Sequence, residues 1–314
     1  MFKAKNAAIS ILFFVFLQTE LFCDSPFQFL RIAESARSSA LAGCFVSMPD
    51  DPSGVFFNPA TIPTVNEKHF SATFLKHILD INSGLITYIK PLEGHATIAG
   101  AISYTNFGSF DYADQLGNRN GNTFGSQNLS VSGTYANQLD SNLYYGVTGK
   151  VIFVTFEKYN ALAFALDAGL LYQIPEKRVN IGLSILHAGT QITSTDGTSE
   201  SVPLDIRLGI NHRLRGLPLL INFSFHHLAD RTDNFFDKFI NFSLGGELYL
   251  GKYIQARLGY NNYIRKYTAP EFDKKLSGFS GGLGIVLKDF NLDYGAAELG
   301  NSAILHRFSV SLDL

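Results

Sequence analysis

The final stretch of the chain, residues 304–314, alternates apolar and polar side chains up to the last position. Phe308, Val310 and Leu312 fall on one face of an extended strand, and Arg307 falls on the other. An outer-membrane β-barrel needs such a strand at its end, because pairing of the last strand with the first closes the barrel and leaves no open edge in lipid. The pattern therefore predicts an all-β, transmembrane outer-membrane β-barrel.

The beginning of the chain is typical of an exported protein. Two lysines precede an apolar run at 7–17, and a short exit follows at 18–23, which together predict a secretory signal peptide over residues 1–23. No later segment approaches the roughly 18 consecutive apolar residues of a membrane-spanning helix. Lipidation at Cys23 is the alternative, although the preceding Glu20-Leu21-Phe22 lacks the small residues that a lipidation site prefers.

The composition agrees with strands that face lipid on one side. Charged residues make up 17% of the chain, against about 25% in an average soluble domain. The net charge of −2 argues against a nucleic-acid-binding surface. After signal removal Cys44 is the only thiol, so no internal disulfide is expected.

Alternation at period two recurs in about fourteen segments between residues 67 and 314, which we assign to the barrel. Charged residues of these segments are expected to face the lumen, because a basic residue on the lipid face costs roughly 2–4 kcal/mol at the membrane midplane. The residues concerned are Lys150, Asp167, Asp205, Arg207, Glu247, Arg257, Asp293 and Arg307.

The predicted connections differ in length. Tight turns are expected at 91–94, 137–141, 175–177, 215–216, 250–251 and 288–289, and long polar loops at 107–125, 189–202, 230–237 and 265–275. Outer-membrane barrels combine short periplasmic turns with long outer loops, and an even strand number places both termini on the periplasmic side. A secreted soluble β-sandwich is the alternative fold.

Residues 24–66 lack the strand pattern. Small residues between Ile32 and Ala42 favour one short helix that stops at Gly43. Because this segment precedes the first strand, we expect it to fold into the lumen as a plug.

Several motifs in this segment resemble the PorV/PorQ family of type IX secretion outer-membrane proteins, which are relatives of the FadL fatty-acid transporters. The motifs are Phe29-Leu30-Arg31-Ile32, the stretch 35–43, Asp50-Asp51-Pro52 and Phe57-Asn58-Pro59-Ala60. Similar pieces recur downstream at 204–209, 258–261, 282–294 and 306–309. The resemblance covers nearly the whole predicted mature chain.

The resemblance implies a non-enzymatic barrel that binds or shuttles secreted cargo and contacts other type IX secretion components and the cell-surface attachment machinery. The alternatives are a FadL-like channel for hydrophobic small molecules and an outer-membrane lipid hydrolase. The inward positions rich in glycine, serine and charge favour the shuttle. The residues expected to fix the plug are Ser35, Ala36, Arg37, Gly43, Asn58, Pro59 and Ala60. The aromatic residues expected to anchor partners in the outer loops are Phe107, Phe110, Tyr112, Phe235, Phe236 and Tyr267.

Other candidate sites are weak. The pair His226-His227 is expected to place its rings on opposite faces of a strand at the barrel rim, without further metal ligands nearby. The loop 114–121 lacks the acidic spacing of a calcium site. No nucleophile constellation, P-loop or dinucleotide fingerprint is present. We therefore expect no catalytic residues, metal or cofactor.

Overall fold

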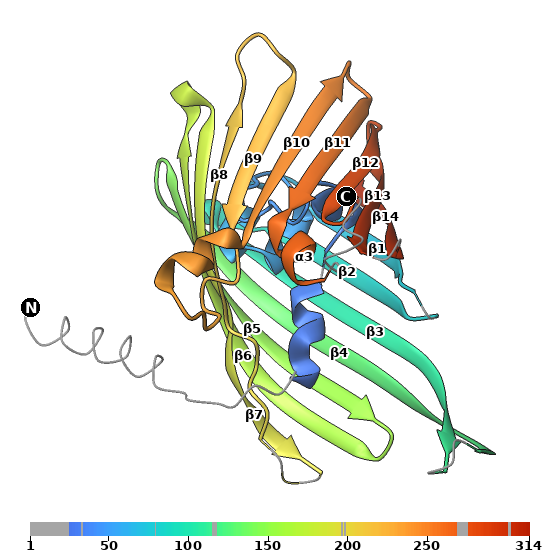
Figure 1. Cartoon of the computed structure of the whole chain (residues 1–314). Coiled ribbons are helices and arrows are strands. Elements are labelled where there is room, and N and C mark those ends of the chain that lie inside the picture. Colours follow the sequence, from blue (N-terminus) through green and yellow to red (C-terminus); the bar gives the residue numbers. More distant parts are fainter. Residues whose placement is uncertain are drawn as a thin grey trace, which may run out of the picture.

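The computed structural model describes residues 25–32, 34–78, 80–114, 118–195, 197, 199–268, 276–300 and 303–314. These residues form a closed antiparallel barrel of fourteen strands in sequence order, so the predicted fold class is confirmed (Figure 1). The strands are β1 His69–Lys76, β2 Asn82–Pro91, β3 Thr97–Ala113, β4 Arg119–Asp140, β5 Leu143–Phe156, β6 Tyr159–Ile174, β7 Val179–Ser194, β8 Asp205–Arg213, β9 Leu219–Phe225, β10 Phe242–Leu250, β11 Ile254–Asn261, β12 Phe279–Val286, β13 Phe290–Gly300 and β14 Ala303–Asp313.

The barrel closes where the last strand meets the first. β14 pairs with β1 from His69 opposite Asp313 to Lys76 opposite His306. This pairing satisfies the backbone groups of both end strands, which is what a barrel in lipid requires. The alternation at the end of the chain therefore serves the closure predicted for it.

The two faces of the wall differ as the alternation predicts. In β5, Val147, Val151 and Phe153 point outward and are exposed, whereas Ile152 and Lys150 point inward and are buried. The outer face is thus an apolar surface of the kind that lipid covers. No described helix is long and apolar enough to cross a membrane.

We call the end that carries Pro175–Lys177 the turn end and the end that carries residues 199–204 the loop end. The strands β3 to β7 reach beyond the other strands at the loop end, at the lower edge of Figure 1. β7 pairs with β8 only up to Leu186, opposite Asp205, while its later residues pair with β6 alone apart from a bridge between Thr190 and Ser201. The wall is therefore tall on one side and low on the other.

Two of the four predicted long loops are wrong wholly or in part, because the strands on the tall side are longer than predicted. Residues 107–125 do not form a long loop, because β3 and β4 continue past a bulge after Asn106 and pair as far as Ala113 opposite Arg119. Similarly, β7 continues to Ser194. The other two predicted loops contain short helices, η6 Phe235–Ile240 and α3 Asn262–Tyr267, and residues 269–275 lie outside the described part of the chain.

We call residues 25–66 the N-terminal segment, and its described residues contain no strand. Four short helices follow one another: η1 Pro26–Ile32, α2 Ala36–Ala40, η2 Pro52–Phe56 and η3 Pro59–Thr64. The helix predicted over 32–42 is limited to α2, since Ala42 and Gly43 both take left-handed backbone conformations. The remaining helical turns, η4 Glu93–His95 and η5 Pro175–Lys177, lie in the turns of the barrel.

The N-terminal segment runs along the lumen between the two ends of the barrel. Its first described residue, Ser25, donates a hydrogen bond to the carbonyl of Ser201 at the loop end. The final residue, Leu314, bonds through its backbone to Lys68 at the turn end. The even strand number places His69 and Asp313 at the same end, whereas the described start of the segment, Ser25, lies at the other end. The position of both termini on the periplasmic side stays a prediction.

Candidate functional site

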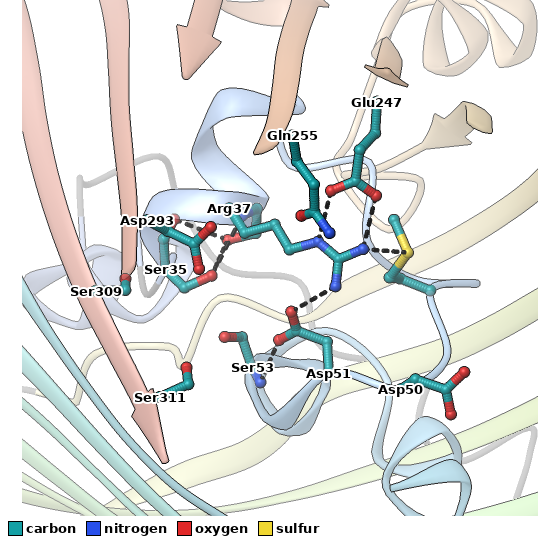
Figure 2. Close-up of polar contacts among 12 residues, drawn as sticks. Ser35, Arg37, Asp50, Asp51, Ser53, Glu247, Gln255, Asp293, Ser309 and Ser311 are labelled. Carbon is teal, nitrogen blue, oxygen red and sulfur yellow. Dashed lines mark hydrogen bonds and ion pairs between the residues drawn. The ribbon is translucent and has the colours of Figure 1, made fainter. Parts of the chain in front are cut away.

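A carboxylate of the barrel wall holds the N-terminal segment through Arg37. The guanidinium Nε of Arg37 donates to Glu247 Oε1 at 2.9 Å, and its Nη2 donates to Glu247 Oε2 at 2.7 Å (Figure 2). Nη1 of Arg37 contacts Asp51 within the segment at 3.0 Å. Two parallel bonds between a guanidinium and a carboxylate are among the strongest and most directional polar contacts in proteins. The guanidinium charge of Arg37 is therefore balanced by carboxylates of the wall and of the segment itself.

Glu247 also accepts hydrogen bonds from other side chains of the wall. Arg257 Nε donates to Glu247 Oε1 at 2.7 Å, and its Nη1 donates to Asp293 at 2.5 Å. The hydroxyl of Tyr249 donates to Glu247 Oε2 at 2.8 Å. The strands β10, β11 and β13 thus build an acidic receptor into which Arg37 fits. Burial alone would lower the pKa of Arg37, but the carboxylates of Glu247 and Asp51 outweigh burial and raise it well above its usual value.

Side-chain caps shape the N-terminal segment around this contact. Ser35 accepts a hydrogen bond from the Ser38 backbone at the start of α2, and Asp51 accepts one from Ser53 at the start of η2. Asn58 caps η3 by accepting from the Ala60 backbone. Such caps satisfy the free backbone N–H groups at helix starts. This matters for short helices inside the lumen, because water is largely excluded there.

Asn58 also connects the segment to the wall. Its Nδ2 donates to the carbonyls of Val46 at 2.8 Å and Leu170 at 3.0 Å, so one buried amide joins two parts of the segment to β6. The neighbouring Pro59 and Ala60 are buried against β5. The Ala36 backbone donates to Ser309 of β14 at 2.9 Å.

Inward-facing glycines make room for the segment. A Cβ atom on Gly146 of β5 would collide with the carbonyl of Pro59, and one on Gly182 of β7 would collide with the carbonyl of Val46. Further glycines face the segment in the same way at positions 169, 245, 259, 282 and 295. Contact between these glycines and the segment was not predicted, although glycine recurring on the inward side of alternating strands is a signal for close approach of another backbone.

A second group of charges fixes η1 near the loop end. Arg31 pairs with both carboxylate oxygens of Asp230, at 3.0 and 2.5 Å, and donates to the carbonyl of Leu204. Asp205 of β8 pairs with Arg207 at 2.7 Å and accepts from the backbone of His227 at 2.6 Å. The connection after β9 is therefore tied to the N-terminal segment.

The pair His226-His227 differs from the prediction. β9 ends at Phe225, and His227 has a φ of 56°, so the backbone turns there instead of continuing as a strand. Both rings are buried, with centroids 4.6 Å apart. Burial lowers the pKa of both rings, that of His226 to about 4. Among the described residues no group of three or more histidine, cysteine or acidic side chains is arranged to hold a metal ion.

The remaining predicted inward charges are paired in the lumen. Lys150 of β5 contacts Asp167 of β6 at 2.6 Å, beside the buried His187. Arg307 of β14 contacts Glu34 at 3.1 Å and donates to Ser39 of α2. Every charged strand residue predicted to face inward is buried or largely buried, and each forms an ion pair. That prediction is confirmed.

The lumen becomes apolar toward the loop end. Phe27, Phe29 and Leu30 of η1 pack against Ile152 and Val154 of β5. The same cluster includes Ala161, Ala163, Ala165 and Val202. In Figure 1, η1 is the blue turn of helix in front of the tall side of the barrel. The chain's own aromatic residues thus occupy the apolar part of the lumen.

An aromatic patch continues from this cluster along the tall side. Phe156 follows Ile152 and Val154 on the inward-facing side of β5. Its ring lies 5.2 Å from Phe124, which lies 5.3 Å from Phe110 and 4.9 Å from Tyr112. Phe110 and Phe156 are 40% and 47% exposed. We call Phe110, Tyr112, Phe124 and Phe156 the aromatic patch.

The predicted partner residues fall in three different places. Phe107, Phe110 and Tyr112 belong to β3 instead of a loop, and two of them join the aromatic patch. Phe235 and Phe236 begin η6 and are exposed. Tyr267 ends α3 and packs against Tyr263.

The comparisons with known proteins find the fold alone. No protein-family model matches the chain, and no curated protein matches its sequence. The Pseudomonas putida toluene transporter TodX matches with a TM-score of 0.60 and 11% identity over 89% of this chain and 97% of that one. The CymD monoaromatic hydrocarbon channel matches with a TM-score of 0.58 and 12% identity over 90% and 98% of the two chains. A Pseudomonas aeruginosa FadL homologue matches with a TM-score of 0.51 and 11% identity over 89% and 98%. The chain has the fold of FadL-like outer-membrane channels.

Proposed function

We propose that this protein is an outer-membrane channel for hydrophobic small molecules and that the N-terminal segment is its plug. The observation that carries the proposal is the apolar surface at the loop end, where the aromatic patch leads directly to the cluster around Phe27 and Phe29. An apolar compound gains free energy by leaving water for such a surface, at about 25 cal/mol per Å² buried. The solved structures of similar fold include hydrocarbon channels, which supports this function over protein secretion.

In this proposal the aromatic patch and the N-terminal segment have different tasks. The aromatic patch collects the compound, and η1 occupies the apolar site that the compound enters. The ion pairs of Arg31 and Arg37 keep the plug closed until the segment moves. A polar, plugged lumen prevents leakage of water-soluble solutes, and the apolar outer face places the barrel in membrane lipid.

Uptake by cells tests the proposal. The protein is expressed in a Gram-negative strain that lacks its own FadL-type channels, and the accumulation of radiolabelled toluene by the cells is measured. We expect the wild-type protein to increase accumulation and the triple variant Phe110→Ala, Phe124→Ala, Phe156→Ala to remove most of the increase. The control is Phe74→Ala, a phenylalanine on the outer face that is 51% exposed. Equal uptake by the wild-type and patch variants would show that the patch does not serve transport.

A second candidate function is the binding of protein partners in type IX secretion, which rests on the motif resemblance to PorV/PorQ proteins. The observation that favours it is the exposure of Phe235 and Phe236, at 66% and 79%, in η6 at the loop end. Exposed aromatic residues often anchor protein interfaces. Replacing both with serine in the native host should impair secretion of type IX cargo without lowering barrel abundance. Normal secretion together with reduced hydrocarbon uptake in the patch variant would leave the channel as the function.

A further inference from the structure

A cavity of about 300 Å³ lies at the turn end, away from the aromatic patch. Met48 and Asp50 of the N-terminal segment form one side of it, and the ends of β6 to β10 form the other. Its volume is at the lower limit for small-molecule sites. The cavity therefore has room for one compact ligand in contact with both the plug and the wall.

Two arginines give the cavity a positive side. Arg178 follows η5, and Arg213 ends β8. Neither guanidinium group forms an ion pair with a carboxylate of the described residues. Arg37 also lines the cavity, but its charge is already balanced by Glu247 and Asp51. Among the described residues, Asp50 is the one carboxylate that lines the cavity beside Arg178 and Arg213. In Figure 2 it lies apart from the contacts of Arg37.

Arg213 is held in place by an aromatic ring. Its Cζ atom lies 4.5 Å from the ring centroid of Tyr249, whose hydroxyl binds Glu247. A guanidinium over an aromatic face keeps its N–H edges free for an anion, because the attraction acts through the flat face of the group. Arg213 is thus positioned to bind a carboxylate and is connected to the receptor of Arg37.

Apolar side chains complete the lining. Met48, Ile174 and Leu220 border the cavity together with the ring of Tyr249. An inorganic anion would leave these surfaces without a partner, whereas a compound with an apolar body and one carboxylate would use both kinds of surface. The combination of cationic and apolar lining therefore favours an organic carboxylate over an inorganic anion.

We propose that the cavity at the turn end binds a small organic carboxylate with an apolar body, which contacts Arg178 and Arg213 through its carboxylate. The bound compound bridges residues 48–50 of the N-terminal segment to the ends of β7 and β8. It therefore stabilises the closed position of the segment. This site goes beyond the proposed channel function and does not depend on it, since it lies at the opposite end of the lumen from the aromatic patch.

The test uses the mature protein in lipid nanodiscs with 4-fluorobenzoate as the probe, followed by ¹⁹F NMR. We expect saturable broadening of the probe signal. Arg178→Gln and Arg213→Gln should each weaken binding roughly tenfold or more, as expected for loss of a charge-assisted hydrogen bond. The matched control is Arg215→Gln, which removes the same charge from the neighbouring turn outside the cavity lining. Heat-modifiable migration on gels shows that each variant is folded.

Competition distinguishes the chemistry of the ligand. Unlabelled benzoate should displace the probe, and neutral benzyl alcohol should not. Saturating benzoate should also slow backbone hydrogen exchange at residues 45–50 in the wild-type protein but not in Arg213→Gln. Displacement by inorganic phosphate as effective as by benzoate would refute the organic carboxylate, and equal binding by the Arg178, Arg213 and Arg215 variants would refute the site. Neither result bears on toluene uptake, so the two proposals fail separately.

Discussion

The guanidinium group of Arg37 donates hydrogen bonds to both carboxylate oxygens of Glu247, at 2.9 and 2.7 Å, although the two residues are 210 positions apart in sequence. One partner belongs to the N-terminal segment and the other to β10, where its side chain is fully buried. This contact joins the segment to the wall at the level where β10, β11 and β13 concentrate their charges. Loss of Arg37 should therefore affect the segment before the barrel, whereas loss of Glu247 would also remove contacts of Arg257 and Tyr249 within the wall.

Replacing Arg37 with alanine should destabilise the closed segment by roughly 3 kcal/mol, the low end for breaking a buried ion pair, because Arg257 still pairs with Glu247. Hydrogen exchange at residues 35–51 should accelerate, while exchange in the strands stays unchanged, since the backbone ladder does not depend on this side chain. Lys288→Ala, at an exposed pair in a turn, is the control. Unchanged exchange in the segment would contradict the role of Arg37.

A substitution at a single inward glycine should displace the segment without breaking its strand. In Gly146→Val the new side chain meets the backbone of Pro59, so the region around η3 must move. At Gly149, three positions along the same strand, an added Cβ atom would meet nothing within 4 Å, so Gly149→Val provides the matched control. Limited proteolysis should cut the segment faster in the first variant only. Equal cutting of both variants would argue against close contact at Gly146.

Cys44 should report the position of the segment. It is buried beside Ser224 of β9, and burial raises its pKa to about 12, so the reactive thiolate is scarce in the closed state. In a Cys23→Ser background, maleimide should label Cys44 slowly in the wild-type protein. Labelling should be at least severalfold faster in the Arg37→Ala variant, as measured by mass spectrometry. Rapid labelling of the folded wild-type protein would be inconsistent with the closed segment.

Acid should loosen the connection after β9. Burial lowers the pKa of His226 to about 4, against 6.5 in an unfolded chain, and the pKa of His227 is lowered as well. Below pH 6.5 the open form takes up protons that the closed form cannot, so closed-state stability falls as the pH drops from about 6.5 to about 4. For His226 alone the loss reaches roughly 3 kcal/mol, at 1.36 kcal/mol per pKa unit.

Hydrogen exchange at residues 226–234, recorded between pH 7 and pH 4 and corrected for the intrinsic rate, measures this loss. The double variant His226→Gln, His227→Gln should lose most of the pH dependence. Asp205, Arg31 and Arg207 act on the same rings and remain in the variant, so they control for general electrostatic effects. A pH dependence equal to that of the wild-type protein would exclude the two histidines as its source.

The barrel architecture could be predicted from local sequence pattern. Period-two alternation, as in 304–314, was sufficient for the strands, for closure and for the inward placement of charges such as Arg257 and Asp293. These features depend on neighbouring residues and on the cost of charge in lipid, and both can be evaluated from sequence alone. The caps at Ser35 and Asn58 are likewise local.

Tertiary structure decided what the pattern left open. Most of the loop predicted at 107–125 is strand, in which Phe110 stacks on Phe124. Sequence alone did not reveal this, because pairing between strands is a long-range property. The partner of Arg37 could not be assigned from sequence, because it depends on barrel register and on the path of the N-terminal segment. That path also places Ser25 at the loop end. Alternation sets which face a side chain occupies, but only the closed barrel brings residues 210 positions apart into contact.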